Sequence, residues 1–92
     1  MKSAYELAME RLERQSPTSP LSAKQKSEIA EIESTFRARI AERELFLKGE
    51  IAKELTAGKP EEAESLRNQL AMDIRRLNDD CETRKTKVRE TQ

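Results

Sequence analysis

Apolar residues recur every three or four positions along most of the chain, the spacing that places side chains on one face of an α-helix. Within residues 22–57 the pattern also repeats at intervals of eleven, most visibly in three Ile-Ala pairs that begin at Ile29, Ile40 and Ile51. Residues 61–90 carry the same period in Leu66, Leu77 and Val88. Such a repeat corresponds to about 3.67 residues per turn, so it predicts two paired helices that are straight or slightly right-handed.

Two short motifs mark where helices should begin. Ser3 with Glu6, and Ser22 with Gln25, have the spacing of a capping box, in which the serine hydroxyl accepts from a free backbone N–H and the later side chain reaches back. The first motif opens a short helix with Tyr5 on its apolar face. The second opens the long helix that carries the eleven-residue repeat.

One turn should separate the two long helices. Gly58 suits the left-handed position that commonly ends a helix, and Pro60 suits the first position of the next one. We therefore expect a single domain over residues 1–92, made of helices 3–15, 22–57 and 61–90, a Ser/Pro linker over 16–21 and a turn over 58–60.

The two apolar stripes match across this turn. If the chain folds back at Gly58, the numbers of facing residues add up to about 117, and apolar residues then meet at five levels. The pairs are Ile51 with Leu66, Leu47 with Leu70, Ile40 with Leu77, Phe36 with Cys81 and Ile29 with Val88. We predict an all-α fold, a long antiparallel helical hairpin (a hendecad-like coiled coil) preceded by a short N-terminal amphipathic helix.

Two basic residues interrupt the predicted seam. Arg43 falls at the level of Ile74, and Lys85 faces Ile32. We expect both side chains to run along the seam edge with their charged ends in water. The alternative is that these residues make polar contacts that fix the register or the oligomeric state.

A two-helix hairpin buries one narrow stripe per helix, a small core for the cost of ordering the chain. We expect three side chains to project from the middle of the hairpin as one patch, and three on the first helix to act as anchors. That helix would either fold back or cross to a second copy, and we favour a homodimer. The candidate interaction residues are Leu45, Phe46 and Met72 in the patch and Tyr5, Met9 and Leu12 on the helix.

Composition narrows the class of protein. Charged residues make up 39% of the chain and aromatic ones 3%, which is typical of long helices. The 18 basic and 18 acidic residues balance, which argues against nucleic-acid binding by bulk charge. There is no apolar run of the length of a membrane span or signal peptide, and Cys81 has no partner for a disulfide. We expect a cytoplasmic protein without a membrane association.

The sequence contains no histidine and no cofactor or metal motif, so we expect no enzyme, no cofactor and no metal site. Its carboxylates have basic neighbours at helical spacing, such as Glu33 with Arg37, which predicts solvated ion pairs. Cys81 is interpreted as a small buried hydrophobic residue.

The last helix ends in a basic surface, which could contact phosphates but also suits the negative end of a helix dipole. Its residues are Arg75, Arg76, Arg84, Lys85, Lys87 and Arg89. The leading hypothesis is a structural or interaction module that binds itself or an unidentified protein partner. The alternative is a small nucleic-acid-associated factor that uses this basic surface.

Overall fold

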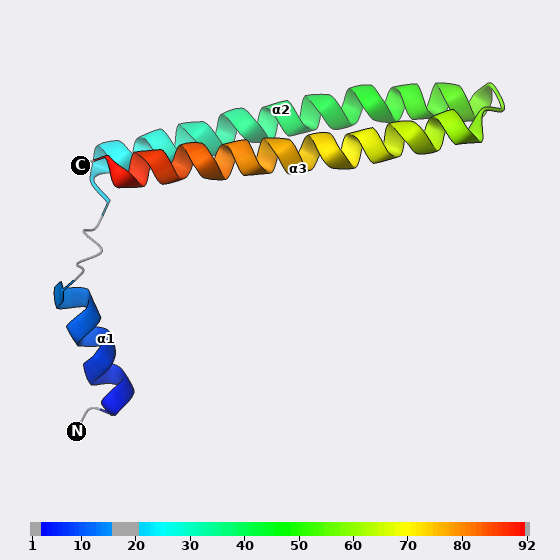
Figure 1. Cartoon of the computed structure of the whole chain (residues 1–92). Coiled ribbons are helices and arrows are strands. Elements are labelled where there is room, and N and C mark those ends of the chain that lie inside the picture. Colours follow the sequence, from blue (N-terminus) through cyan, green and yellow to red (C-terminus); the bar gives the residue numbers. More distant parts are fainter. Residues whose placement is uncertain (1–2, 16–20, 92) are drawn as a thin grey trace.

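The computed structural model describes residues 3–15 and 21–91, with the side chains of residues 3–10 and 21–91. Within this part of the chain there are three α-helices and no strand: α1 (Ala4–Gln15), α2 (Ala23–Thr56) and α3 (Pro60–Glu90). α2 and α3 lie side by side and antiparallel along their whole length (Figure 1). The predicted all-α helical hairpin, preceded by a short helix, is confirmed.

Both predicted capping serines hold the start of a helix. The backbone N–H of Gln25 donates to Ser22 Oγ at 3.1 Å, and the N–H of Ser22 donates to Gln25 Oε1 at 2.8 Å, which completes the capping box. At the start of α1 the N–H of Glu6 donates to Ser3 Oγ at 3.2 Å. These bonds satisfy N–H groups that have no partner within the first helical turn.

The turn between the long helices has the hydrogen bonds of a Schellman motif. Gly58 has a φ of 75°, and its N–H donates to the Leu55 carbonyl at 3.1 Å. The N–H of Lys59 donates to the Glu54 carbonyl at 2.8 Å. Pro60 follows as the first residue of α3, where its missing N–H costs nothing. Local chemistry thus reverses the chain within a few residues.

The core is the seam between α2 and α3. Phe36 and Leu47, which are eleven residues apart in the repeat, are almost completely buried. The other apolar members of the two stripes are buried or half-buried. Within the described residues the buried apolar residues are Phe36, Leu47, Ile51, Ala63 and Cys81. The predicted stripes therefore face each other, but they enclose only a small core.

Polar contacts across the seam agree with the predicted register. The ion pairs of Glu33 with Lys85 and of Arg43 with Asp73 each lie within one residue of it. At about 1.5 Å per residue, the 34 residues of α2 make an arm of about 50 Å.

Gln25 also closes the open end of the hairpin. Its Nε2 donates to the carbonyl of Val88 at 3.0 Å and to the carbonyl of Thr91 at 2.5 Å. These two acceptors lie at the C-terminus of α3, where Thr91 is the C-cap residue and its own N–H also donates to the Val88 carbonyl. One side chain therefore caps the start of α2 and holds the end of α3.

α1 makes no contact with either long helix among the described residues (Figure 1). In the described part of the chain, α1 is therefore not folded back onto the hairpin. In the same part of the chain, no helix has both the length and the apolar character needed to cross a membrane.

Candidate interaction surfaces

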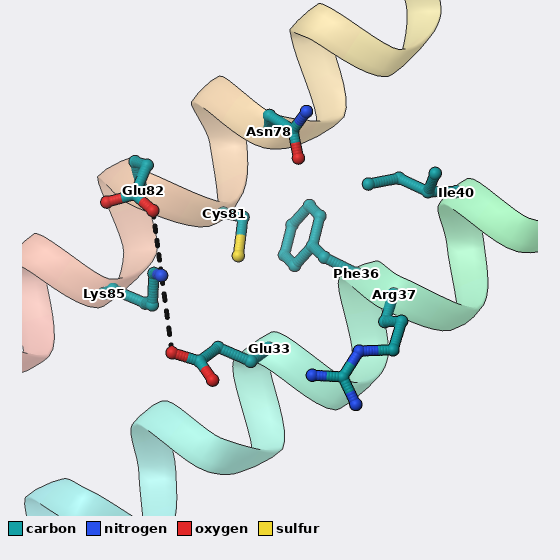
Figure 2. A pocket seen from close by; sticks show the side chains of 8 residues that line it. All are labelled: Glu33, Phe36, Arg37, Ile40, Asn78, Cys81, Glu82 and Lys85. Atoms are coloured by element: carbon teal, nitrogen blue, oxygen red, sulfur yellow. Dashed lines mark hydrogen bonds and ion pairs between the residues drawn. The ribbon is translucent and has the colours of Figure 1, made fainter.

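Phe36 is the centre of the seam. Its ring and the thiol of Cys81 point toward each other from the two helices, as the register predicts (Figure 2). Around them lies a hollow of about 320 Å³, with Ile40 and Asn78 at one end and Lys85 at the other. Cys81 is a free but buried thiol, which agrees with its interpretation as a small hydrophobic residue.

Lys85 is held between two carboxylates. Its Nζ lies 2.8 Å from Glu82 on the same helix and 3.4 Å from Glu33 on α2 (Figure 2). The Lys85 side chain is only 13% exposed. The expectation that its charged end lies in open water is therefore wrong, because Glu82 on the same helix and Glu33 across the seam both pair with the amine. Glu33, expected to pair with Arg37, contributes to this cross-helix contact instead.

This arrangement shifts the pKa of two groups. The hydrogen bond from Lys85 lowers the pKa of the Glu82 carboxyl below its ordinary value. The same bond raises the pKa of the Lys85 amine, with a smaller contribution from Glu33. Lys85 stays protonated at neutral pH, so it is a structural cation and not a nucleophile.

A second ion pair joins the helices nearer the turn. Arg43 Nε donates to Asp73 Oδ2 at 2.7 Å. At about 100° per residue, Arg43 and Glu33 lie on different sides of the α2 stripe, and Asp73 and Lys85 lie on different sides of the α3 stripe. The two ion pairs therefore flank the seam on opposite edges. This is the geometry expected of polar contacts that specify register.

Two arginines cover the Phe36 ring. Arg39 Cζ lies 5.0 Å from the ring centroid and Arg84 Cζ lies 5.3 Å from it, both within cation–π range. Arg84 reaches the ring from the other helix, so it contributes to the hairpin itself. Of the six residues of the predicted basic surface, Arg84 and Lys85 thus have partners in the seam. The exposed remainder is Arg75, Arg76, Lys87 and Arg89.

The predicted mid-hairpin patch is exposed but not continuous. Leu45 is 78% exposed, Phe46 59% and Met72 65%. Leu45 lies nine positions after the buried Phe36, and Met72 nine positions before the buried Cys81, which is half a turn out of phase at about 100° per residue. Leu45 and Met72 therefore lie on opposite outer edges of the hairpin, and only Phe46 borders a groove between the helices. The expectation of one patch is wrong, because residues opposite the seam on two paired helices point in opposite directions.

That groove lies beside the Arg43–Asp73 pair. Phe46 and Leu77 form its apolar part, and it encloses about 410 Å³. Its polar rim consists of Arg39, Glu42 and Arg43. We call it the Phe46 groove.

α1 presents its own apolar face without a partner in the described residues. Tyr5 is 73% exposed, and Met9 on the same face is exposed as well. Leu7, which lies off that face, is also exposed. The side chain of Leu12, the third predicted anchor, lies outside the described residues.

The described side chains include no cluster of three or more His, Cys, Asp or Glu residues that could hold a metal ion. The chain matches no known protein family, no curated protein and no solved structure. The features that bear on its function are therefore the hairpin and its exposed surfaces.

Proposed function

We propose that this protein is a non-enzymatic helical-hairpin module that binds by helix packing, and that its first partner is a second copy of itself. The observation that supports this is the imbalance between its buried and exposed apolar side chains. Among the described residues the large apolar side chains that are buried are Leu47, Ile51 and Phe36, while the other large apolar residues of the seam are half-buried. The large apolar side chains that remain exposed are Tyr5, Leu7, Met9, Leu45, Phe46, Leu55 and Met72.

Such a core contributes little stability for a chain of this length. Ordering costs about 1.5 kcal/mol per residue, and small scaffolds usually offset this with disulfides, metals or oligomerisation. Cys81 is a free thiol, so a disulfide within the chain does not supply the difference. Burial of the exposed apolar side chains against another helical surface would provide the stability that the small core lacks.

The free thiol also leads us to place the module in the cytoplasm, where thiols are kept reduced. We give less weight to a nucleic-acid function. Lys85, whose pKa is raised, pairs with two carboxylates of the hairpin, and Arg84 stacks on Phe36. These two cations of the basic surface therefore already have partners within the hairpin. Retardation of RNA or DNA at low salt, abolished at higher salt, would bring that alternative back.

Light scattering of the purified chain over a concentration series tests self-association. We expect the mass to rise with concentration to twice that of one chain. A chain that keeps the mass of a monomer throughout, and that still unfolds cooperatively, would contradict the proposal. The hairpin would then have to be regarded as stable alone.

A further inference from the structure

α1 needs a surface that its own chain does not provide in this structure. It has only 12 residues, and isolated helices shorter than about 12–15 residues are marginal in water. Its apolar face exposes Tyr5 and Met9, and it contacts neither α2 nor α3 among the described residues. An amphipathic helix of this kind is stabilised mainly by packing its apolar face.

One face of the hairpin carries a second hollow beside the Phe46 groove. This second hollow of about 280 Å³, lined by Ile32, Phe36 and Val88 among others, lies along α2 from the Phe46 groove. Ile32 and Phe46 are fourteen residues apart, about four helical turns, so they share one face of α2. At about 1.5 Å per residue they are separated by about 21 Å, while α1 is about 18 Å long. A helix of that length that begins at Phe46 would cover the Phe46 groove and reach the near edge of the second hollow at Phe36.

Charge also differs along this face. Arg39, Arg43 and Glu42 border the Phe46 groove, whereas Glu28, Glu31 and Arg84 border the hollow near Ile32, so the groove is the more basic of the two. Glu6 is the acidic residue in the first turn of α1. When α1 runs antiparallel to α2, Glu6 therefore faces the basic end of this face. Tyr5 then lies near Phe46.

We propose that the Phe46 groove receives α1 of a second copy, so that two copies exchange their first helices. This rests on the proposed self-association and identifies the surface that brings it about. Each copy contributes Tyr5 and Phe46, which are 73% and 59% exposed. A fully buried aromatic side chain removes about 150–250 Å² from water, so the exposed parts of the four rings supply about 400–650 Å². Met9 and the aliphatic lining of the groove add to this area, and specific interfaces bury about 1,200–2,000 Å² in total.

Three single substitutions test the surface in the whole 92-residue chain, with mass measured by sedimentation velocity. Tyr5→Ser removes the anchor and Phe46→Ser removes the receptor, so each should raise the dimer dissociation constant about tenfold or more, as loss of an anchoring aromatic does. Leu45→Ser is the matched control, because Leu45 is adjacent and at least as exposed but lies on the outer edge of α2. It should leave the dissociation constant unchanged. Circular dichroism of each variant checks that the hairpin is intact.

Mixing the two weakened variants distinguishes exchange from fold-back. In a mixed dimer, the Tyr5→Ser chain still offers an intact Phe46 groove to the intact α1 of the Phe46→Ser chain. Mixed dimers with one restored interface should therefore form at concentrations at which each variant alone is a monomer. A chain with Glu6→Arg alone, which keeps every apolar side chain in place, should also dimerise more weakly than wild type.

Three outcomes would overturn the exchange. A dimer that resists both serine variants but is disrupted by Leu45→Ser would place the interface on the outer edge of α2, and self-association would still stand. Failure of the mixture to dimerise would show that α1 does not cross between copies. A wild-type chain that is monomeric at every concentration would overturn both this inference and the proposed function.

Discussion

The side chain of Gln25 has two roles that one substitution can separate. Its Oε1 accepts from the Ser22 N–H, which caps α2, while its Nε2 donates to the carbonyls of Val88 and Thr91 at the end of α3. Glutamate keeps an acceptor for Ser22 but has no N–H to donate. Gln25→Glu should therefore preserve the capping box and remove only the cross-helix bonds.

The size of the effect follows from these two bonds. Each should contribute about 0.5–1.5 kcal/mol net to stability. The bond to Val88 is partly buried and the bond to Thr91 is exposed, so their sum falls in the lower part of the range. A negative charge is favourable at the start of α2 and unfavourable at the end of α3, and these effects offset each other. We expect Gln25→Glu to lower the free energy of unfolding by about 1–2 kcal/mol at neutral pH.

The loss should diminish in acid. A carboxylate facing two carbonyl oxygens is destabilised, so the pKa of the introduced carboxyl should be higher in the folded chain than in the unfolded one. A group whose pKa is raised on folding favours the folded state once it is protonated. As the pH falls through this raised pKa, the protonated carboxyl regains a donor, and the gap in stability to wild type should narrow.

Urea unfolding followed by far-ultraviolet circular dichroism measures both effects. Protein concentration must be kept constant, because the stability of a self-associating chain depends on it. Ser22→Ala is the control, since it removes only the cap, at a cost of about 0.5–2 kcal/mol, and introduces no titrating group. If Gln25→Glu were as stable as wild type at neutral pH while Ser22→Ala was destabilised, the bonds from Gln25 to Val88 and Thr91 would contribute nothing to stability. That result would refute the role given to Gln25 between the helices.

Four further substitutions address the turn, an exposed position of α2 and the seam. Gly58→Ala should destabilise the hairpin by about 1–2 kcal/mol in thermal unfolding, because the φ of Gly58, 75°, is left-handed. Gly49→Ala should instead stabilise it by about 0.5–1 kcal/mol, because Gly49 lies within α2 and a methyl group there meets open space. Since the pKa of Glu82 is lowered and that of Lys85 is raised on folding, their contribution to stability should be present between their ordinary values of 4.5 and 10.5 and be lost in acid and in strong base. Lys85→Met should flatten this pH profile, and an unchanged profile would show that the pair does not stabilise the fold. Phe36→Ala should cost about 3–5 kcal/mol in urea unfolding, and a loss below about 1 kcal/mol would contradict the central place of this ring.

The local elements of the fold could be predicted from the chain alone. Capping at Ser22, reversal at Gly58 and the start of α3 at Pro60 depend on backbone chemistry within a few residues, so their motifs carry the information. The facing of Phe36 and Cys81 was also predictable. It follows from two stripes of the same period that are joined by a single turn.

The contacts between the helices were decided only by the tertiary structure. Gln25 was predicted as a cap, but its bonds to α3 depend on where the distant end of that helix lies. Lys85 was expected in water and Arg84 on a free basic surface, whereas the paired helices place one beside Glu33 and the other over Phe36. Spacing along the chain reveals neighbours on the same helix, and these partners lie more than forty residues apart.

The same reason separates Phe46 from its neighbour Leu45. Both residues are large and apolar and lie outside the predicted seam, so the sequence makes both of them candidates for binding. Only the rotation of α2 about its axis, set by burial of Phe36 and Leu47 against α3, turns Phe46 toward a groove and Leu45 away from it. The sequence by itself thus determined the hairpin, its turn and its register, because these follow from local chemistry and periodicity. The tertiary structure decided which surfaces the hairpin presents, because that depends on how two helices are oriented against each other.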